Sequence, residues 1–490
     1  TTGNVTLTTT SGGDIRVGGD FHGAGGPRAQ KTYVSDDSTI RADATRAGDG
    51  GSVVVWSDQV TRFAGTISAR GGPMGGHGGV AEVSGKETLF YRGFTDLRAV
   101  MGERGSLLLD PKNIVIAAGG ADPIAGNEAF ADAPADTRTF SPADVVTALD
   151  GANLTLQANN DITISDPIDA SANAGAGDLT LQAGRSIAID ADVTLRGSFT
   201  ATANDTDASL VAAQRDPGPA TISMAPGTTI DTSATGGNIQ LRVLEGGAAD
   251  TSASSMTIAS LNAGSGHVLA RYAGPTSGQG IQRADASSLI TASSAAFATN
   301  GSGGSGFLGA SAAPIRLSVD NLEAVAQRNG AFFTNDKSIT VGGAALGGLS
   351  GISVVSTAVT GDLSLEADGA MSVNEPITVA RDANLSATDG VTLASSVATN
   401  TTLSGSSSIN ADADGDNNTG GTPDPLTLGA AGSITTNGNP LSLTVGDLSI
   451  NPAASINAGV GTLGISGSAG ASTIGVGGGL AGDAVSISQA

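Results

Sequence analysis

Short apolar stretches in which every second residue is small and polar recur along this chain of 490 residues. LTLQANNDITI begins at Leu154 and LTLQAGRSIAI at Leu179, and related stretches begin at Leu363 and Leu426. In each copy a second apolar stretch starts eight residues after the first. A period of two predicts strands of about three to five residues, with leucine and isoleucine on the buried face and residues such as Thr155 on the other.

Strands this short are stable only when copies stack on one another, so the repeat length is informative. The copies at Leu154 and Leu179 are offset by 25 residues. Near the N-terminus, residues 39–57 overlay residues 66–84 at an offset of 27, which matches Val53 with Val80.

Repeats of about this length, with glycine, asparagine or aspartate at the corners, are typical of a coil that returns one strand spacing further along an axis. The sequence therefore predicts an all-β fold, a right-handed parallel β-helix with loop excursions. Phe63 and Phe90 are also 27 residues apart. We expect these two rings to stack inside the coil.

Breaks in the pattern predict five regions. They are β-helix coils with the 27-residue repeat at 1–117, a loop and short helix at 118–150, β-helix coils at 151–295, a Gly/Ser-rich loop and irregular coils at 296–345, and β-helix coils with an acidic loop (411–424) at 346–490. In the second region Ser141 can cap a helix that starts with Pro142 and ends at Gly151. In the fourth, we predict strands over 317–333.

Composition restricts the classes of function. The chain has 73 glycines, no cysteine and 3% aromatic residues. Ordinary enzyme cores use aromatic side chains as their bulkiest residues, so this composition disfavours a large bowl-shaped catalytic domain. Its formal net charge of −23 argues against nucleic acid and anionic lipid as partners. The sequence has no run of 18 apolar residues, so it is predicted not to span a membrane.

The acidic loop holds the strongest candidate for a bound ion. Asp412, Asp414 and Asp416 stand at alternate positions, a spacing that lets carboxylate oxygens converge on calcium. The loop departs from the EF-hand pattern, which has glycine where Asn417 stands and a glutamate farther on. A solvated acidic turn with weak or no binding is the alternative. No other cofactor is predicted.

Catalytic motifs are absent from the sequence. The three histidines, His22, His77 and His267, have no second ligand at metal spacing, and no nucleophilic serine is joined to a histidine and an acid in usable order. We therefore predict that the chain is not an enzyme. The alternative is a carbohydrate-active β-helix enzyme or depolymerase, which would place two carboxylates beside an aromatic in an exposed groove.

Four stretches resemble the large secreted exoproteins of the filamentous haemagglutinin type, which leave Gram-negative bacteria by two-partner secretion. They are GGDFHG from Gly18, the 35 residues from Ser38 to Gly72, GGVAEVSGKETL from Gly78, and GSLLLDPKNIVI from Gly105. The resemblance covers residues 13–116 closely, and beyond residue 300 it is limited to strand periodicity.

The resemblance implies a secreted, extracellular β-helix fibre at the bacterial cell surface that works in adhesion or biofilm cohesion. The partners it implies are an outer-membrane transporter for the full-length protein and a glycan or protein receptor on a cell surface or matrix. The family's N-terminal secretion domain is missing, so we expect residue 1 to lie downstream of it. The stick of a contact-dependent toxin is a further alternative.

Overall fold

The computed structural model describes residues 12–119, 137–208, 215–245, 255–274, 279–299, 306–355, 361–399, 405–415 and 424–468. The chain divides into two compact units, Thr1–Asp250 and Thr251–Ala490. Asp416 of the predicted calcium site lies outside the described residues.

Unit 1 is built from short strands with one α-helix among its described residues. Its elements are β1 (Asp14–Val17), η1 (Phe21–Gly23), β2 (Lys31–Val34), β3 (Thr39–Arg41), β4 (Ser52–Ser57), β5 (Val60–Phe63), β6 (Thr66–Ser68), β7 (Val80–Gly85), β8 (Thr88–Tyr91), β9 (Phe94–Asp96), β10 (Ser106–Asp110), β11 (Asn113–Ile116), β12 (Thr137–Phe140), α1 (Pro142–Gly151), β13 (Asn153–Ala158), β14 (Ile162–Ile164), β15 (Ile168–Asp169), β16 (Leu179–Ala183), β17 (Ile187–Ile189), β18 (Val193–Thr194), β19 (Phe199–Ala203), β20 (Ile222–Met224), β21 (Thr229–Asp231) and β22 (Ile239–Val243).

Unit 2 continues the same kind of element. It contains β23 (Met256–Ile258), β24 (Ser260–Asn262), β25 (His267–Tyr272), β26 (Ile281–Arg283), β27 (Ile290–Thr299), β28 (Ile315–Ala326), β29 (Ala331–Asn335), β30 (Ile339–Val341), η3 (Leu346–Gly348), β31 (Ile352–Val354), β32 (Leu363–Ala367), β33 (Met371–Val373), β34 (Ile377–Val379), β35 (Ala383–Ala387), β36 (Val391–Leu393), β37 (Ser396–Thr399), β38 (Ser407–Asn410), β39 (Pro425–Leu428), β40 (Ser433–Thr435), β41 (Leu441–Val445), β42 (Asp447–Ile450), β43 (Ser455–Asn457) and β44 (Leu463–Gly467).

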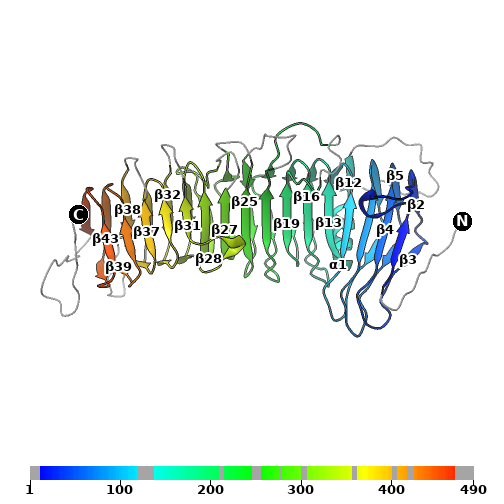
Figure 1. Ribbon diagram of the computed structural model, residues 1–490, viewed down its shortest axis with the longest axis horizontal. Helices are drawn as coiled ribbons and strands as arrows, with labels where there is room; N and C mark the ends of the chain where they lie inside the picture. Colours follow the sequence, from blue (N-terminus) through cyan, green and yellow to red (C-terminus); the bar gives the residue numbers. More distant parts are fainter. Residues whose placement is uncertain are drawn as a thin grey trace. The chain divides into compact units, whose positions relative to one another are not determined.

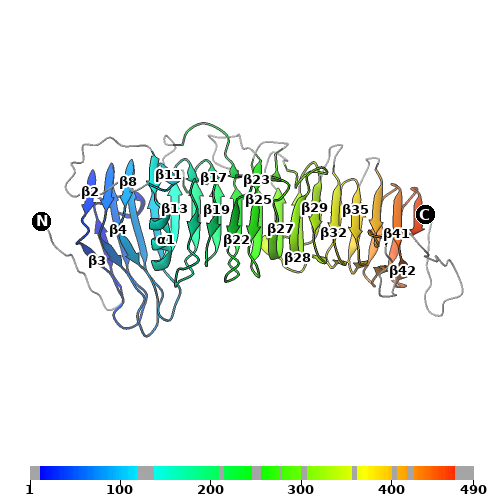
Figure 2. The ribbon, with the colours of Figure 1, turned by 180° about the vertical axis from the view of Figure 1, so that it is seen from behind.

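Each unit is a parallel β-helix, which confirms the predicted fold class. In unit 1, β13, β16 and β19 lie side by side as parallel strands (Figure 1), and β14 with β17 and β15 with β18 form two further columns. In unit 2, β29, β32 and β35 form one column (Figure 2), with β30, β33 and β36 in a second and β31, β34 and β37 in a third. Each of these coils therefore contributes one strand to each of the three columns.

The predicted buried and exposed faces of the central coils are confirmed. Leu154 pairs in register with Leu179, and Leu179 pairs with Phe199. All three side chains are at most 1% exposed, whereas Thr155 and Thr180 are partly exposed on the other face. Apolar side chains stacked coil on coil thus form the narrow core that the alternation predicts.

The register of the N-terminal coils differs by one residue from the predicted overlay. Val53 pairs with Ala81, not with Val80. Ala81 is fully buried and Val80 is 45% exposed. The loop between β6 and β7 is one residue longer than the loop between β3 and β4, and a shift of one residue turns a strand's side chains to the opposite face.

The same shift makes the predicted stacking of Phe63 on Phe90 wrong. Phe63 pairs with Tyr91, and their rings stack with centroids 5.5 Å apart. Phe90 points out of the coil, where the guanidinium groups of Arg62 and Arg138 lie 4.5 Å and 3.6 Å from its ring centroid. Phe90 therefore belongs to an outer cation–π arrangement and not to the core.

Helix α1 begins and ends as the sequence predicts. The Ser141 hydroxyl oxygen accepts a hydrogen bond from the backbone N–H of Asp144 (3.1 Å), Pro142 is the first helical residue, and Gly151 is the last. Immediately before the helix, Thr137–Phe140 form β12, a strand paired with β11, within a stretch that lacks the alternating pattern. Pairing with β11 thus makes Thr137–Phe140 a strand that the sequence periodicity does not predict.

In the range 296–345, much of the described chain is regular. The 12-residue strand β28 pairs with β27 on one side and with β29, β30 and β31 in turn on the other. One continuous strand therefore stacks against a whole three-strand coil. Within the described part of the chain, no helix combines the length and the apolar character needed to cross a bilayer.

Candidate functional site

An enlarged corner of unit 2 separates β38 from β39. Ile409 in β38 pairs with Leu385, and Leu426 in β39 pairs with Val391. Leu385 and Val391 are six positions apart in their coil, whereas Ile409 and Leu426 are 17 positions apart in theirs. The acidic loop predicted at 411–424 is thus an insertion of about eleven residues into one corner, and the coil resumes its register after it.

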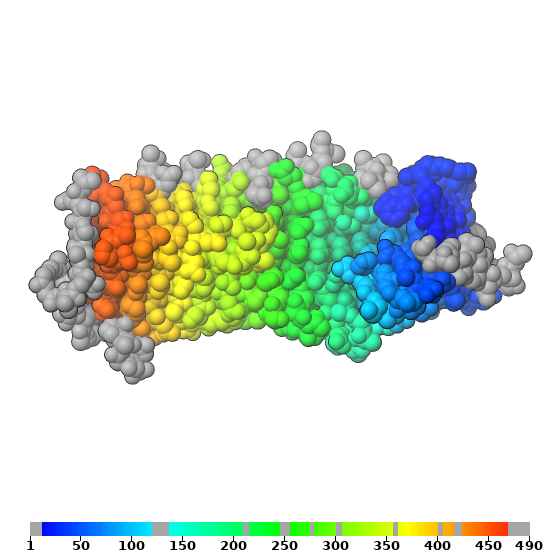
Figure 3. All heavy atoms as spheres, turned by 60° about the horizontal axis from the view of Figure 1, so that its bottom comes forward, coloured from blue at the N-terminus to red at the C-terminus, as the bar shows by residue number. Residues whose placement is uncertain are grey.

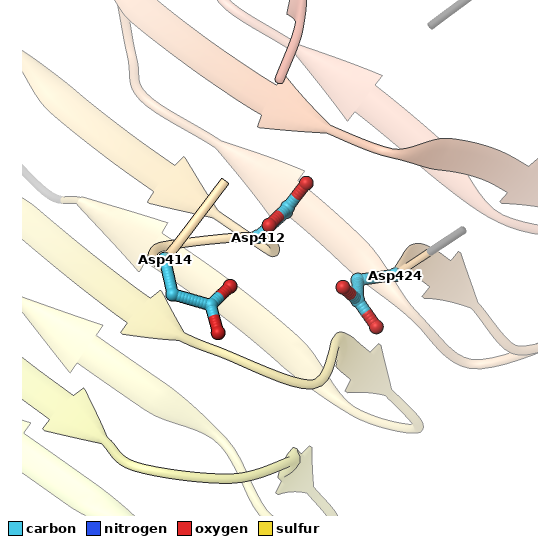
Figure 4. Close-up of side chains that lie close together, drawn as sticks. All are labelled: Asp412, Asp414 and Asp424. Atoms are coloured by element: carbon cyan, nitrogen blue, oxygen red, sulfur yellow. The ribbon is translucent and has the colours of Figure 1, made fainter. Parts of the chain in front are cut away.

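Three aspartates lie at the two ends of this insertion. Asp412 and Asp414 follow β38, and Asp424 precedes β39. One carboxylate oxygen from each lies within 4.8 Å of the others, and Figure 4 shows the three side chains around one space. The structure therefore brings together two of the three predicted ligands. It adds Asp424, which sequence spacing missed because the residue is ten positions beyond Asp414.

Backbone hydrogen bonds to neighbouring coils hold both ends of the insertion. The N–H of Ala413 donates to the carbonyl oxygen of Ala387 in the preceding coil (2.9 Å). Within its own coil, the N–H of Asp412 donates to the side-chain Oδ1 of Asn410 (3.3 Å). On the other side, the carbonyl oxygen of Asp424 accepts from the N–H of Gly446 (3.0 Å). Hydrogen bonds to neighbouring coils therefore help to place the chain that carries these carboxylates.

The three carboxylates differ in burial. Asp412 is 3% exposed and Asp424 is 2% exposed, while Asp414 is exposed. Both carboxylate oxygens of Asp412 are buried and have no hydrogen-bond partner among the described residues. A buried carboxylate without hydrogen bonds is strongly unfavourable unless a partner such as a cation compensates its charge.

A second pair of carboxylates, the buried Glu82 and the partly exposed Asp110, lies on the outer face of the N-terminal coils. Glu82 is fully buried, and its Oε2 accepts a hydrogen bond from the backbone N–H of His22 in η1 (2.9 Å). Burial raises the pKa of Glu82, and burial together with the charge of Glu82 raises the pKa of Asp110 well above its ordinary value. Trp56 pairs in register with Ser84, and Ser84 pairs with Asp110.

This pair has the composition of the alternative enzyme site, two carboxylates near an aromatic, but it is not an exposed groove. Trp56 is 6% exposed. A Cβ added at Gly19 or Gly23 would lie 2.4 Å or 2.5 Å from its ring, so the segment that contains η1 lies directly on the indole. Glu82 and Trp56 are therefore covered, and a bound sugar would have to displace that segment.

A groove of about 610 Å³ lies beside the first three coils and is lined by arginines from successive turns. Asp43 lies 3.5 Å from Arg41 and 3.6 Å from Arg70, and Arg98 pairs with Asp96 at 2.8 Å. Each arginine side chain remains about half exposed. Three guanidinium groups paired with two carboxylates thus gather at this groove of a strongly acidic chain.

The three histidines lie in different parts of the chain and do not form a common site. His22 lies in η1 at a φ of 52°, His77 accepts a hydrogen bond at Nδ1 from the N–H of Glu103 (3.0 Å), and Nδ1 of His267 lies 3.2 Å from the hydroxyl of Ser293. Within the described ranges, the group of three metal-ligand side chains is the aspartate cluster and includes no histidine.

No protein-family model matches the chain, and no curated protein matches it.

Proposed function

We propose that this chain is a stalk segment of a secreted bacterial surface adhesin that acts by reach and by repeated weak contacts along its coils. The observation that carries the proposal is the stacking of parallel coils in both units. Each coil adds one strand spacing of about 4.8 Å to its unit. The exposed surface of such a fold grows with the number of coils, and its interior is filled by the side chains that pack one coil on the next.

The outer surface of the coils carries residues that suit weak contacts with a partner in aqueous solution. Outward positions of the central strands are small and polar, as in the row of Thr155, Thr180 and Thr200. On the face drawn in Figure 3, the part of unit 2 coloured yellow to orange is continuous and has no deep hollow. These features support a role in contact along an open surface more than turnover in an enclosed site.

The arginine groove supplies a candidate contact for the receptor. Three half-exposed guanidinium groups in one groove favour carboxylated or sulfated glycans, because arginine pairs with such oxyanions in bidentate geometry. Val100, 75% exposed at the edge of the groove, adds apolar contact area. We propose that an anionic glycan of a cell surface or matrix binds here.

Location is the first test of the proposal. In a bacterium that expresses the full-length gene, an antibody raised against this chain should label intact cells, and protease added outside should remove the label. Loss of the outer-membrane partner transporter should leave the protein inside the cell. Labelling that requires cell lysis would contradict a surface role.

Binding is the second test. The purified chain should bind immobilised anionic glycans with an affinity that falls as salt rises. Substitution of Arg70 by alanine should weaken this binding, whereas substitution of Arg316, which does not line the groove, should not. Release of new reducing ends from a panel of polysaccharides would instead support the carbohydrate-active enzyme.

A further inference from the structure

We propose that Asp412, Asp414 and Asp424 together bind one calcium ion, which ties the two ends of the corner insertion to the body of unit 2. The proposal concerns this corner alone and holds whether or not the chain is an adhesin. These ligands come from both ends of the loop, whereas the three aspartates predicted from sequence spacing all follow β38.

The buried carboxylate of Asp412 is the observation that points to a cation. Asp412 is 3% exposed, and neither of its carboxylate oxygens has a hydrogen-bond partner among the described residues. The register places Thr388 at the corresponding position of the preceding coil, and Asp368 in the coil before that, where the carboxylate is exposed. Of these three coils, only the coil with the insertion has a buried carboxylate at this position, beside two further carboxylates.

The chemistry of the ligands favours calcium. All three are carboxylates, the hard oxygen donors that calcium prefers, and zinc would favour histidine or cysteine. Calcium–oxygen distances of about 2.4 Å place ligands on opposite sides of the ion about 4.8 Å apart, and the three oxygens lie within that limit of one another. Magnesium requires a tighter octahedron and retains more of its water.

The exposed position of Asp414 completes the geometry. Asp412 and Asp424 bring charge to the buried side of the space, and Asp414 closes it from the solvent side. A cation can therefore reach the site from solvent without movement of the coils. Binding would join the chain after β38 to the chain before β39 and so restrict the insertion at both of its ends.

Calcium titration of the full chain by calorimetry tests the proposal, after removal of metal with a chelator. We expect one site with a dissociation constant of roughly 0.1 to 1 mM, the range of extracellular calcium modules. Asp412→Thr, which copies Thr388 of the preceding coil, should weaken binding at least tenfold. The matched control Asp368→Asn removes an exposed aspartate from the same column of corners and should leave the affinity unchanged.

Thermal unfolding provides a second readout that separates a ligand from a structural role. Saturating calcium should raise the melting temperature of the wild-type chain and of Asp368→Asn by a few degrees. Without metal, Asp412→Thr should melt no lower than the wild type, because it removes a buried charge, and calcium should not raise its melting temperature. If that variant does not fold, Asp414→Asn at the exposed ligand should give the same loss of binding.

Three results would overturn the proposal. One is the absence of heat with millimolar calcium in the wild-type chain. Another is undiminished binding in both Asp412→Thr and Asp414→Asn, which would indicate counter-ions elsewhere on the acidic surface. Equal affinity for magnesium would refute the assignment to calcium. None of these results bears on the surface location tested above.

Discussion

The substitution of Leu179 by alanine tests the stacked core most directly. Leu179 is fully buried between Leu154 in the preceding coil and Phe199 in the next. The change removes three carbon atoms at about 0.8 kcal/mol each, or roughly 2.4 kcal/mol. If about 40 Å³ of void remains between the flanking side chains, at about 24 cal/mol per Å³ it adds roughly 1 kcal/mol. We expect a total loss of about 3 to 4 kcal/mol.

Urea-induced unfolding followed by far-ultraviolet circular dichroism measures this loss as a lower midpoint with an unchanged slope. The control is Thr180→Ala, one residue along the same strand but facing outward, which should cost less than about 0.5 kcal/mol. Equal losses at the two positions would refute the assignment of inner and outer faces. A loss of only about 2.4 kcal/mol at Leu179 would mean that adjacent coils close the void, and a loss below about 1 kcal/mol would contradict its burial in a stacked core.

Two further predictions concern the covered outer face of the N-terminal coils. Because the pKa of Glu82 is raised in the folded state, its carboxyl group stays protonated there at pH values just above the ordinary glutamate pKa of about 4.3. The same group is ionised in the unfolded chain at these pH values, so the free energy of unfolding should fall as pH rises above about 4.3. In melting temperatures measured from pH 4 to 8, Glu82→Gln should show a smaller decrease with rising pH than the wild type. An unchanged pH dependence would contradict the assignment of this decrease to Glu82. Gly23→Ala would place a Cβ 2.5 Å from the ring of Trp56, the chain's single tryptophan, and should shift its emission to longer wavelength. Gly25→Ala, also at positive φ but with no atom within 4 Å of the added Cβ, should leave the emission unchanged.

Local pattern was sufficient to predict the fold class and several of its details. The alternation around Leu154 and Leu179 determines which side chains are buried, because successive strand residues point to opposite faces and only one face can pack on the next coil. The ends of α1 follow from Ser141 and Pro142, whose effects are confined to one helical turn. The acidic corner is also visible, since its composition interrupts the repeat.

Only the tertiary structure decided relations that depend on loop length. The one extra residue between β6 and β7 moved the partner of Phe63 from Phe90 to Tyr91, although the apolar pattern of each strand is unchanged. Asp424 joined Asp412 because the strands on either side of the insertion are each paired with neighbouring coils, which brings its two ends together. Spacing along a chain does not specify where a loop returns, whereas hydrogen-bonded register between coils does.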